Sequence, residues 1–327
     1  LLGLSCFPTD HDFYVGFLGM HGNYGPNVLT NEADVIIAIG MRFDDRVTGN
    51  LASYAKQAKI IHIDIDPAEI NKNVPAEVGL VGDAKQVLEQ LLPYIQSPTP
   101  EHNRENWHKK FQDCHKTEFE QIIQGEIHAN GDEIKMAEVV HLLAEKTHGE
   151  AVIVTDVGQH QMVTARYYQF KKNSMHITSG GLGTMGFALP AAIGAKLGAY
   201  DKQVIAIIGD GGFQMNIQEL GVIDQEGVPL KIIILNNQHL GMVRQWQEMF
   251  FAKRYSFVEL KNPNFIKIAE GYSIPAVRIE KHADLNQALD DMLAATTPYL
   301  LEIVVEKQEK IFPMIVSGSG VSEIRLS

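Results

Sequence analysis

The sequence predicts an α/β protein with two domains, each built around a parallel β-sheet. Runs of valine, isoleucine and leucine alternate with amphipathic segments along the chain, which is the pattern of parallel strands buried on both faces between helices. A length of 327 residues leaves room for about two domains of ordinary size. The polar stretch SPTPEHNREN at residues 97–106 is the best candidate for the linker between them.

The first domain is expected over residues 1–97, and residues 98–131 are expected to form a linker that includes a helix. In this part of the chain the patterns predict strands at residues 34–40 and 59–66 and helices at residues 83–95 and 107–127. Asp83 stands at the start of the first of these helices and is a suitable N-cap.

The second domain is expected over residues 132–327. Its patterns predict a helix at residues 136–146 and strands at residues 151–156, 204–208, 231–235 and 299–305. Parallel sheets bind ligands beyond the carboxyl ends of their strands, which is where Asp156, Asp210 and the pair Asn236-Asn237 fall. These strand ends are therefore the predicted binding site.

Composition narrows the possible functions. A hydrophobic content of 45% predicts a sizeable core, and a formal net charge of -12 argues against binding to nucleic acid. Cys6 and Cys114 are too few for a disulfide framework, so a reducing compartment, the cytoplasm, is predicted. No apolar run approaches the roughly 20 residues that cross a bilayer. The chain opens without methionine inside the apolar stretch LLGLSCF, which predicts that it begins within a longer protein.

The segment from Gly209 to Asn237 carries the most informative pattern. One apolar run, VIAIIG, leads into Asp210 between two glycines, and a second apolar run ends at the paired asparagines. Glycine lets the backbone turn tightly and approach a ligand closely. Carboxylate and amide oxygens are ligands of Mg²⁺, which takes further oxygens from phosphate and water. We therefore predict a metal clamp for a phosphorylated ligand.

Residues 181–186, GLGTMG, match the GxGxxG fingerprint of dinucleotide-binding sites, and Asp210 lies near the position of its ribose-binding acid. Such a fingerprint follows a buried strand, whereas the preceding residues NSMHITSG predict a weak strand at best. Three hypotheses stay open: a nicotinamide site, a turn whose backbone lies against another cofactor, and a purely structural turn before a helix of small residues.

His62, Asp64 and Asp66 alternate along one predicted strand and therefore project from the same face. These side chains are candidates for a metal site. Carboxylates at a strand end more commonly contact a ribose or solvent, so both hypotheses are retained.

Arg42, Asp44, Asp45 and Arg46 follow the strand VIIAIG. Two guanidinium groups at a strand end are able to bind a diphosphate bidentately. The alternative is a loop of solvated ion pairs.

Gln159 and His160 follow Asp156 and begin a predicted helix, whose first N–H groups would face a phosphate. The alternative for His160 is a packed or capping side chain. An apolar stripe follows Asn237; it is either core or, beside a metal site, the wall of a substrate pocket. Its members are Leu240, Met242, Val243, Trp246 and Met249.

The pattern GDG, 24 residues (212–235) and then NN closely resembles the thiamine diphosphate motif of the enzymes that use this cofactor. Further segments extend the resemblance over essentially the whole chain: SGGLGTMGFALPAAIG, DVGQHQM, NNQHLGMVRQWQ, MRFDDRVTGN and FPMIVSGSG. Together they resemble the catalytic subunits of the acetohydroxyacid synthase (acetolactate synthase) family. The resemblance implies a partial flavin-type middle domain followed by a diphosphate-binding domain.

The resemblance also implies individual roles. Asp210, the side chain of Asn237 and the backbone carbonyl of His239 would bind Mg²⁺. The carbonyl of Gly183 would accept a hydrogen bond from the aminopyrimidine ring, and Met185 would support the bent cofactor. Further thiamine diphosphate contacts would come from Gln159, His160, Thr184, Gly211, Gly212, Leu240, Gly241 and Met242. The pocket of the second keto acid would be lined by Met242, Val243 and Trp246, with Trp246 selecting the larger substrate.

In the first domain the resemblance implies an FAD site. Its residues would be Leu18, Gly19, Met20, His21, Gly40, Met41, Arg42, Phe43, Asp44, Asp64, Ile65, Asp83 and Ala84. Asp45 and Arg46 would lie at the mouth of the active-site channel.

The implied reaction decarboxylates pyruvate and ligates the hydroxyethyl carbanion to pyruvate or 2-oxobutanoate, in branched-chain amino-acid biosynthesis. Another decarboxylase or carboligase of the same cofactor class stays an alternative. A homodimer or tetramer, and a small regulatory subunit, are implied partners. The family's pyrimidine-binding domain, with the glutamate that activates the cofactor, is missing from these residues, so the chain alone is expected to be inactive.

Overall fold

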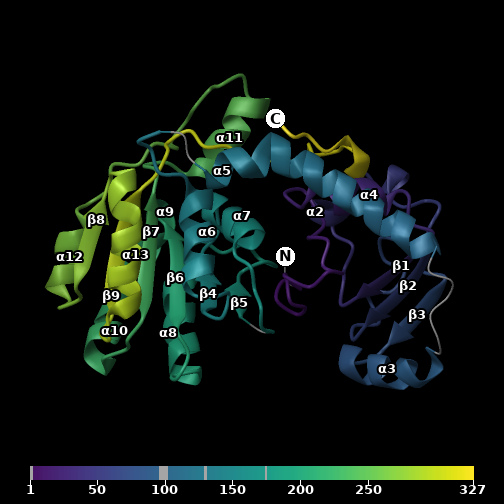
Figure 1. The fold of residues 1–327 in the computed structure, drawn as a ribbon, viewed down its shortest axis with the longest axis horizontal. Helices are drawn as coiled ribbons and strands as arrows, with labels where there is room; N and C mark the ends of the chain where they lie inside the picture. Colours follow the sequence, from purple (N-terminus) through teal and green to yellow (C-terminus); the bar gives the residue numbers. More distant parts are fainter. Residues whose placement is uncertain (1–2, 96–101, 129–130, 174) are drawn as a thin grey trace. The chain divides into compact units, whose positions relative to one another are not determined.

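The computed structural model describes residues 3–95, 102–128, 131–173 and 175–327 (Figure 1). Contacts within the chain divide it into two compact units. The larger unit comprises Leu1–Tyr14 and Gln124–Ile311, and the smaller one Val15–Ile123 and Phe312–Ser327. The prolines of the predicted linker, Pro98 and Pro100, lie outside the described residues.

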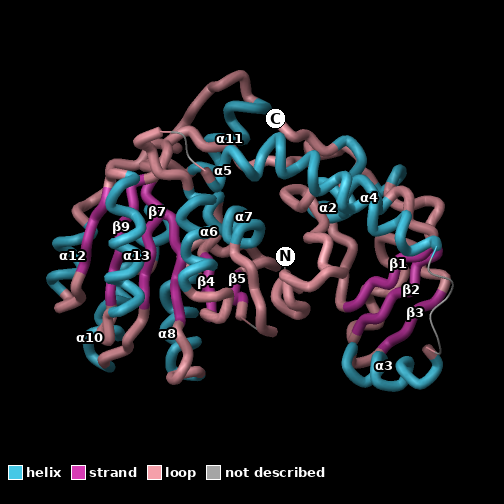
Figure 2. Tube along the Cα trace, viewed as in Figure 1, coloured by secondary structure: helices cyan, strands magenta, loops and turns pink. Residues whose placement is uncertain are grey.

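The larger unit is built on a six-stranded sheet in which neighbouring strands are parallel, in the order β5-β4-β6-β7-β9-β8 (Figure 2). Its strands are β4 (Val152–Thr155), β5 (His176–Thr178), β6 (Val204–Gly209), β7 (Lys231–Asn236), β8 (Ala276–Ile279) and β9 (Tyr299–Val304). The central strands β4, β6 and β7 are buried almost throughout, as their unbroken apolar sequences predict. The parallel-sheet prediction is confirmed.

The strand order changes direction next to β4. From β4 the chain first adds β5 on one side and then β6 and β7 on the other. A crevice forms at such a switch point because the helices that follow the two neighbouring strands turn to opposite faces of the sheet. Asp156 follows β4 and Asp210 follows β6, so both stand at this point.

Helices accompany the sheet along its length (Figure 1). They are α5 (Gln124–Ile127), α6 (Met136–Lys146), α7 (Gln159–Tyr167), α8 (Ala188–Gly198), α9 (Asp210–Met215), α10 (Leu220–Glu226), α11 (Gly241–Phe250), α12 (Phe265–Gly271) and α13 (Leu285–Ala294), with 3-10 turns at Ile217–Glu219 and His282–Asp284. Helix α8 packs on β4 and β6, and α13 packs on β9 and α6. The predicted helix at residues 136–146 and the predicted helix start at Gln159 are confirmed.

The smaller unit contains a three-stranded parallel sheet, β1-β2-β3. Its elements are α1 (Tyr24–Thr30), β1 (Val35–Ile39), α2 (Asp45–Thr48), β2 (Lys59–Asp64), β3 (Val78–Val81), α3 (Ala84–Leu91) and α4 (His102–Glu118), with 3-10 turns at Leu51–Ser53, Leu92–Tyr94 and Val321–Glu323. The side chain of Asp83 accepts a hydrogen bond from Gln86 N, which confirms the predicted N-cap. The helix predicted to end at Ile95 ends earlier, because Pro93 cannot continue its hydrogen bonds.

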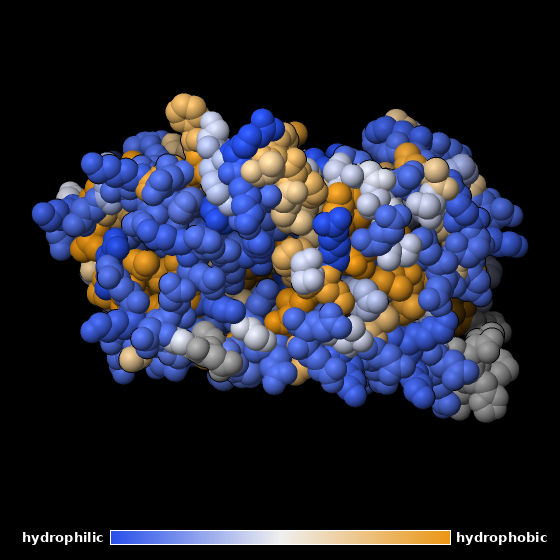
Figure 3. Space-filling model, turned by 90° about the horizontal axis from the view of Figure 1, so that it is seen from above, coloured by the Kyte–Doolittle hydropathy of each residue, from blue (hydrophilic) through white to orange (hydrophobic). Residues whose placement is uncertain are grey.

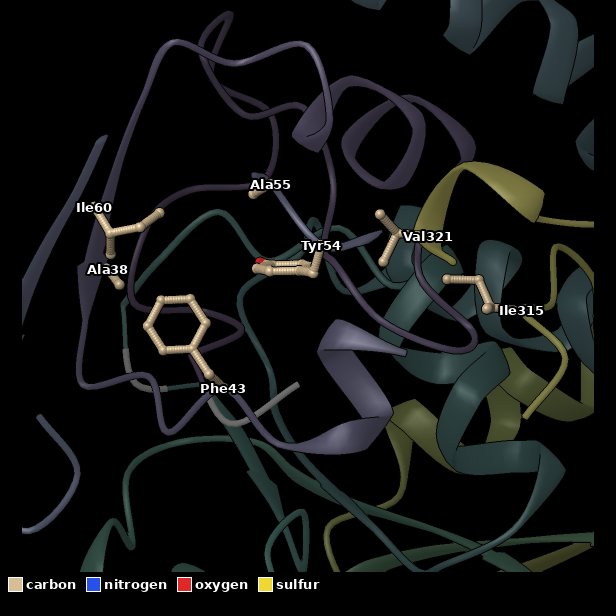
Figure 4. Close-up of a cluster of buried hydrophobic side chains, with 7 residues drawn as sticks. All are labelled: Ala38, Phe43, Tyr54, Ala55, Ile60, Ile315 and Val321. Carbon is tan, nitrogen blue, oxygen red and sulfur yellow. The ribbon is translucent and has the colours of Figure 1, made fainter. Parts of the chain in front are cut away.

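One buried cluster joins the sheet of the smaller unit to the end of the chain (Figure 4). The ring of Phe43 meets that of Tyr54 edge to face, at a centroid distance of 6.1 Å. Ile315 and Val321 pack into the same cluster, although Ile315 is more than two hundred residues away from both rings along the chain. The cluster consists of Ala38, Phe43, Tyr54, Ala55, Ile60, Ile315 and Val321.

The expectation of strands buried on both faces is wrong for β1. Val35, Ile37 and Ile39 are between 42% and 53% exposed, whereas Ala38 is buried. The reason is that, among the described residues, only one face of this strand is packed. All four residues of β3, which the apolar pattern did not predict, are exposed as well.

The helix predicted at residues 107–127 is interrupted. Helix α4 ends at Glu118 and continues through a π-helical turn, Phe119–Ile123, into the short α5. The division between the two units falls at the end of this turn. Among the described residues, no helix combines the length and apolar composition needed to span a bilayer.

Replacing Ile233 by alanine tests how much the central strands contribute to the stability of the fold. Ile233 is fully buried in β7, so Ile233→Ala should lower the free energy of unfolding by about 2–5 kcal/mol in urea titrations. Val277→Ala on the edge strand β8, where the side chain is 39% exposed, should cost about 1 kcal/mol or less. Equal losses for the two variants would contradict this prediction.

Candidate functional site

Asp156 anchors the site at the switch point of the large sheet. Its Oδ1 accepts hydrogen bonds from Val157 N at 2.9 Å and Gly186 N at 3.0 Å, and its Oδ2 accepts one from Ala188 N at 2.9 Å. The residue is completely buried, so these three backbone donors replace the water that the carboxylate gave up. They fix the glycine-rich loop and the start of α8 to the end of β4.

The glycine-rich loop, residues 181–186, is held at Gly186 by Asp156 and at its middle by Ser179. Gly183 has a φ of +65°, which a residue with a side chain adopts only with strain. Ser179 holds the middle of the loop: its carbonyl accepts from Gly183 N at 3.0 Å, and its Oγ accepts from Thr184 N at 3.0 Å. Leu182 is 94% exposed. The loop therefore presents its backbone to the surface, as the second and third hypotheses for GLGTMG both allow.

Asp210 begins α9 directly after β6 and is buried. Its Oδ2 accepts a hydrogen bond from Asn262 Nδ2 at 2.7 Å. Burial raises the pKa of Asp210 to about 6, against the hydrogen bonds from Asn262 and from backbone N–H groups, which lower it. A buried carboxylate with a raised pKa is poorly compensated in the protein alone and is suited to a cation.

The paired asparagines at the end of β7 bond to different parts of the unit. Asn236 Nδ2 donates to Glu302 Oε1 at 2.7 Å, within the sheet. Asn237 Nδ2 instead donates to Gln159 Oε1 at 3.3 Å, and its Oδ1 accepts from His239 N at 3.0 Å. The imidazole Nδ1 of His239 lies 2.9 Å from the carbonyl oxygen of Asn237. Of the two asparagines, Asn237 is therefore the one that meets the residues after β4.

Gln159 joins three segments of the larger unit. Its Nε2 donates to the carbonyl of Glu309 at 2.7 Å and to Gln245 Oε1 at 3.2 Å. Gly241 leaves the space for this arrangement, because a Cβ there would lie 2.0 Å from Gln159 Oε1 and 2.8 Å from Asn237 Nδ2. The predicted residues Gln159, Asn237 and Gly241 thus come together.

A second group of predicted residues shares one wall. A Cβ placed on Gly211 would lie 2.8 Å from Leu240 Cδ2 and 3.9 Å from Met185 Cε. These contacts bring the glycine after β6, the loop before α8 and the start of α11 to the same place. A ligand that is seated at the strand ends would meet all three.

His160 is buried, with its ring next to Gly209. Burial lowers the pKa of its imidazole to about 4, against the nearby Asp156, which raises it. The ring is therefore neutral at pH 7. Its Nε2 is buried and has no hydrogen-bond partner. An orphaned polar atom of this kind is an argument for a bound polar group or water.

Glu309 lies beneath Gln159 and was not predicted as a site residue. Its Oε2 accepts from Met136 N at 3.2 Å, while its Oε1 is buried without a partner. Burial raises the pKa of Glu309 to about 8. The carboxyl group is therefore largely protonated at neutral pH, and its own backbone carbonyl supports Gln159.

Helix α11 has an inverted distribution of polar and apolar residues. Its buried residues are Arg244 and Gln245, and Val243 is 47% exposed. Gln245 bonds the backbone of Ile311 in both directions, at 2.9 Å and 3.2 Å, and Arg244 pairs with Glu248 at 3.1 Å. The apolar stripe, Leu240 to Met249, is therefore not core, which favours the alternative of a pocket wall. Figure 3 shows apolar residues between hydrophilic ones on the side of the molecule where α11 lies.

In the smaller unit, predicted FAD residues follow three parallel strands. Gly40 to Asp44 come after β1, Asp64 ends β2 and is followed by Ile65, and Asp83-Ala84 come after β3. Since the strands are adjacent and parallel, these segments share one edge of the sheet. The segment Leu18 to His21 is tied to helix α2, because Met20 N donates to Arg46 O at 2.6 Å.

Asp45 and Arg46 border a small pocket of about 180 Å³ in the smaller unit. Arg42 pairs with Asp44 at 3.0 Å and Arg46 with Asp45 at 3.6 Å, so the ion-pair alternative accounts for both guanidinium groups. The pocket is lined by Met20, Asp45, Arg46, Gly49, Ile315, Val316, Ser317 and Gly318.

The metal hypothesis for His62, Asp64 and Asp66 is not supported. His62 is buried with Nε2 at 2.8 Å from the carbonyl of Met41, and Asp64 Oδ1 accepts from Asp66 N at 2.9 Å. The strand ends at Asp64, so Asp66 no longer follows its alternation. Within the described ranges, no group of three or more His, Cys, Asp or Glu side chains is arranged to hold a metal ion.

Two family models match the chain. The thiamine pyrophosphate enzyme C-terminal TPP binding domain matches residues 156–303, and the thiamine pyrophosphate enzyme central domain matches residues 1–91. The chain therefore belongs to the thiamine pyrophosphate enzymes. The first match contains both the glycine-rich loop and the motif from Gly209 to Asn237, so the nicotinamide hypothesis is set aside.

Within this family the chain is similar to acetolactate synthases. It is 43% identical over 336 residues to acetolactate synthase 1, chloroplastic, of Oryza sativa subsp. japonica, covering 100% of this chain and 51% of that protein. It is 40% identical over 331 residues to the acetolactate synthase isozyme 3 large subunit of Escherichia coli (strain K12), covering 100% and 57%. The isozyme 2 large subunit of that strain is 41% identical over 325 residues, covering 99% and 57%. The chain thus spans about half the length of the curated relatives it matches.

Asp156→Asn tests the anchoring of the loop. An amide has one acceptor atom where the carboxylate has two, so at least one buried N–H would lose its partner at a cost of about 1–3 kcal/mol. Hydrogen exchange at Gly186 or Ala188 should become about tenfold faster or more. Asp201→Asn, in an exposed turn, should leave these amides unchanged. Unaltered exchange in Asp156→Asn would show that the carboxylate does not hold the loop.

Glu309→Gln tests the pH dependence of stability. The pKa of this carboxyl is raised from 4.5 to about 8, so between these values the folded chain holds one proton more than the unfolded chain. This group therefore lowers the free energy of unfolding as pH rises from about 5 to 8, by up to about 1.4 kcal/mol per pH unit.

In Glu309→Gln this contribution disappears, so the variant should gain stability relative to the unchanged chain as pH rises. Urea midpoints at pH 5 to 8 measure the effect. Glu270→Gln, at an exposed position of α12, is the control and should run parallel to the unchanged chain. A parallel curve for Glu309→Gln itself would contradict the assignment.

Proposed function

We propose that this chain forms the thiamine diphosphate- and Mg²⁺-binding part of an acetolactate synthase. The observation that carries the proposal is the convergence of Gln159, Asn237 and Gly241 beside His160, whose buried Nε2 has no partner. The relatives named acetolactate synthase support it through 40–43% identity over the whole chain. The proposed reaction decarboxylates pyruvate and joins the remaining two carbons to pyruvate or 2-oxobutanoate.

Mg²⁺ would be held by Asp210, the side chain of Asn237 and the backbone carbonyl of His239. The donor set fits, because these are hard oxygen ligands and Mg²⁺ completes its octahedron with phosphate and water. The raised pKa of Asp210 is consistent with a carboxylate that lacks a compensating charge until a cation binds.

The diphosphate would contact Gln159 and His160, with the backbone of Gly211 and Gly212 nearby. Gly183, Thr184 and Met185, together with Leu240, Gly241 and Met242, would surround the rest of the cofactor. Neutral His160 has an unused Nε2 and would exchange a hydrogen bond with it. Thiamine diphosphate, when bound, supplies an electron sink for the loss of CO₂ from a 2-keto acid.

The second keto acid would meet Met242, Val243 and Trp246. Val243 is 47% exposed and Met242 and Trp246 are half-buried, whereas the polar Arg244 and Gln245 of the same helix are buried. An apolar wall at this place would exclude water from the reacting atoms and accommodate the alkyl group of the acceptor. Trp246, the largest of the three, would distinguish 2-oxobutanoate from pyruvate.

FAD would lie along the carboxyl edge of the sheet in the smaller unit. The segments that would hold it are Leu18 to His21, Gly40 to Asp44, Asp64-Ile65 and Asp83-Ala84. The pocket beside Asp45 and Arg46 would belong to the channel by which substrates enter.

Two relatives are named large subunits, so we also propose that the complete protein assembles with a small regulatory subunit and as a homodimer or homotetramer. We retain the cytoplasm as its proposed compartment, since both cysteines are free.

Binding of thiamine diphosphate, with and without Mg²⁺, tests the proposed function. We expect Mg²⁺-dependent binding by calorimetry. Asp210→Ala should weaken it by more than about 100-fold, because losing a metal ligand exceeds the roughly 10–100-fold effect of outer-shell changes. Asp224→Ala, at an exposed position of α10, should bind normally. Binding that needs no Mg²⁺, or binding of NAD(H) instead, would overturn the proposal.

A further inference from the structure

The side chain of Asn262 is fully engaged at the proposed metal site. Its Nδ2 donates to Asp210 Oδ2 at 2.7 Å and to Asn236 Oδ1 at 3.0 Å. Its Oδ1 accepts from Gln214 Nε2 at 2.9 Å. The Asn262 amide nitrogen thus donates to both Asp210 and Asn236, and the amide oxygen accepts from Gln214 of α9.

Further polar side chains hold Asn262 and its partner Asn236 in place. Asn236 donates from Nδ2 to Glu302 Oε1 at 2.7 Å, and the same oxygen accepts from Arg278 at 2.8 Å. Glu302 is buried in β9, whereas the Arg278 side chain is 37% exposed. The hydrogen bonds therefore form a continuous chain from the surface of β8 through β9 and β7 to Asp210.

The backbone brings Asn262 to this place. The segment before it runs antiparallel to the residues after β7, with Leu240 N donating to Val258 O at 2.8 Å and Leu260 N to Gln238 O at 2.8 Å. This short pairing continues the end of β7 and turns the chain toward α9. Because Asn264 caps α12 through Lys267 N at 3.0 Å, the loop is fixed on both sides of Asn262.

We propose that Asn262 is a positioning residue for the metal-binding carboxylate of Asp210, and that Asn236 and Glu302 hold Asn262 in turn. The inference rests on the proposed function of Asp210 as a ligand of Mg²⁺. The hydrogen bond from Asn262 to one carboxylate oxygen restricts the rotation of the group, in addition to the backbone N–H groups that also bond to this carboxylate. Partners of this kind commonly set metal affinity by about 10–100-fold.

The test measures, by calorimetry, how thiamine diphosphate binding to the full chain depends on the Mg²⁺ concentration. Asn262→Ala should raise the Mg²⁺ concentration for half-maximal binding by about 10–100-fold, while saturating Mg²⁺ restores most of the affinity. Asn264→Ala removes a neighbouring cap and is the matched control. It should lower the melting temperature without changing the Mg²⁺ requirement.

Glu302 provides a second pair of variants. Glu302→Gln keeps an oxygen that is able to accept from both Asn236 and Arg278, so it should change the Mg²⁺ requirement less than Glu302→Ala. An unchanged requirement in Asn262→Ala, with Mg²⁺-dependent binding intact in the parent chain, would overturn this inference alone. Loss of Mg²⁺ dependence in the parent chain would instead overturn the proposed function and this inference with it.

Discussion

The fold of the larger unit depends on how polar groups are satisfied where buried parallel strands end. Backbone and side-chain polar atoms at such ends have lost water and need partners inside the protein. Asp156 meets this requirement by binding three N–H groups, and Gln159 meets it by joining Asn237, Gln245 and the carbonyl of Glu309. The same groups that complete the fold therefore surround the proposed cofactor site.

This constraint explains why the site combines rigid and open parts. The strand ends and the polar face of α11 are tied by buried side chains, so their geometry is fixed before any ligand binds. The glycine-rich loop is anchored at its base by Asp156 and exposed at its tip, where Leu182 has few neighbours. The strand ends and α11 thus position the site, whereas the glycine-rich loop is its accessible part.

The sequence predicted the elements whose signals are local. The apolar runs that became β4, β6, β7 and β9 were recognisable because buried parallel strands need unbroken hydrophobic sequence. Strands β3 and β8 lack such runs and were not predicted. Asn262 and Glu309 were missed for another reason: they lie 52 and 150 residues from the groups they bind, Asp210 and Gln159, and nothing in a single sequence links such pairs.

In helix α11, the residues that hold the helix in place differ from those that would face a ligand. Gln245 secures it to the backbone of Ile311, whereas Val243 is 47% exposed. Such a helix has room to vary. Substitutions at its less buried apolar residues would change which ligands bind there with little loss of folding stability. Ligand selectivity is therefore able to evolve at this surface independently of the fold.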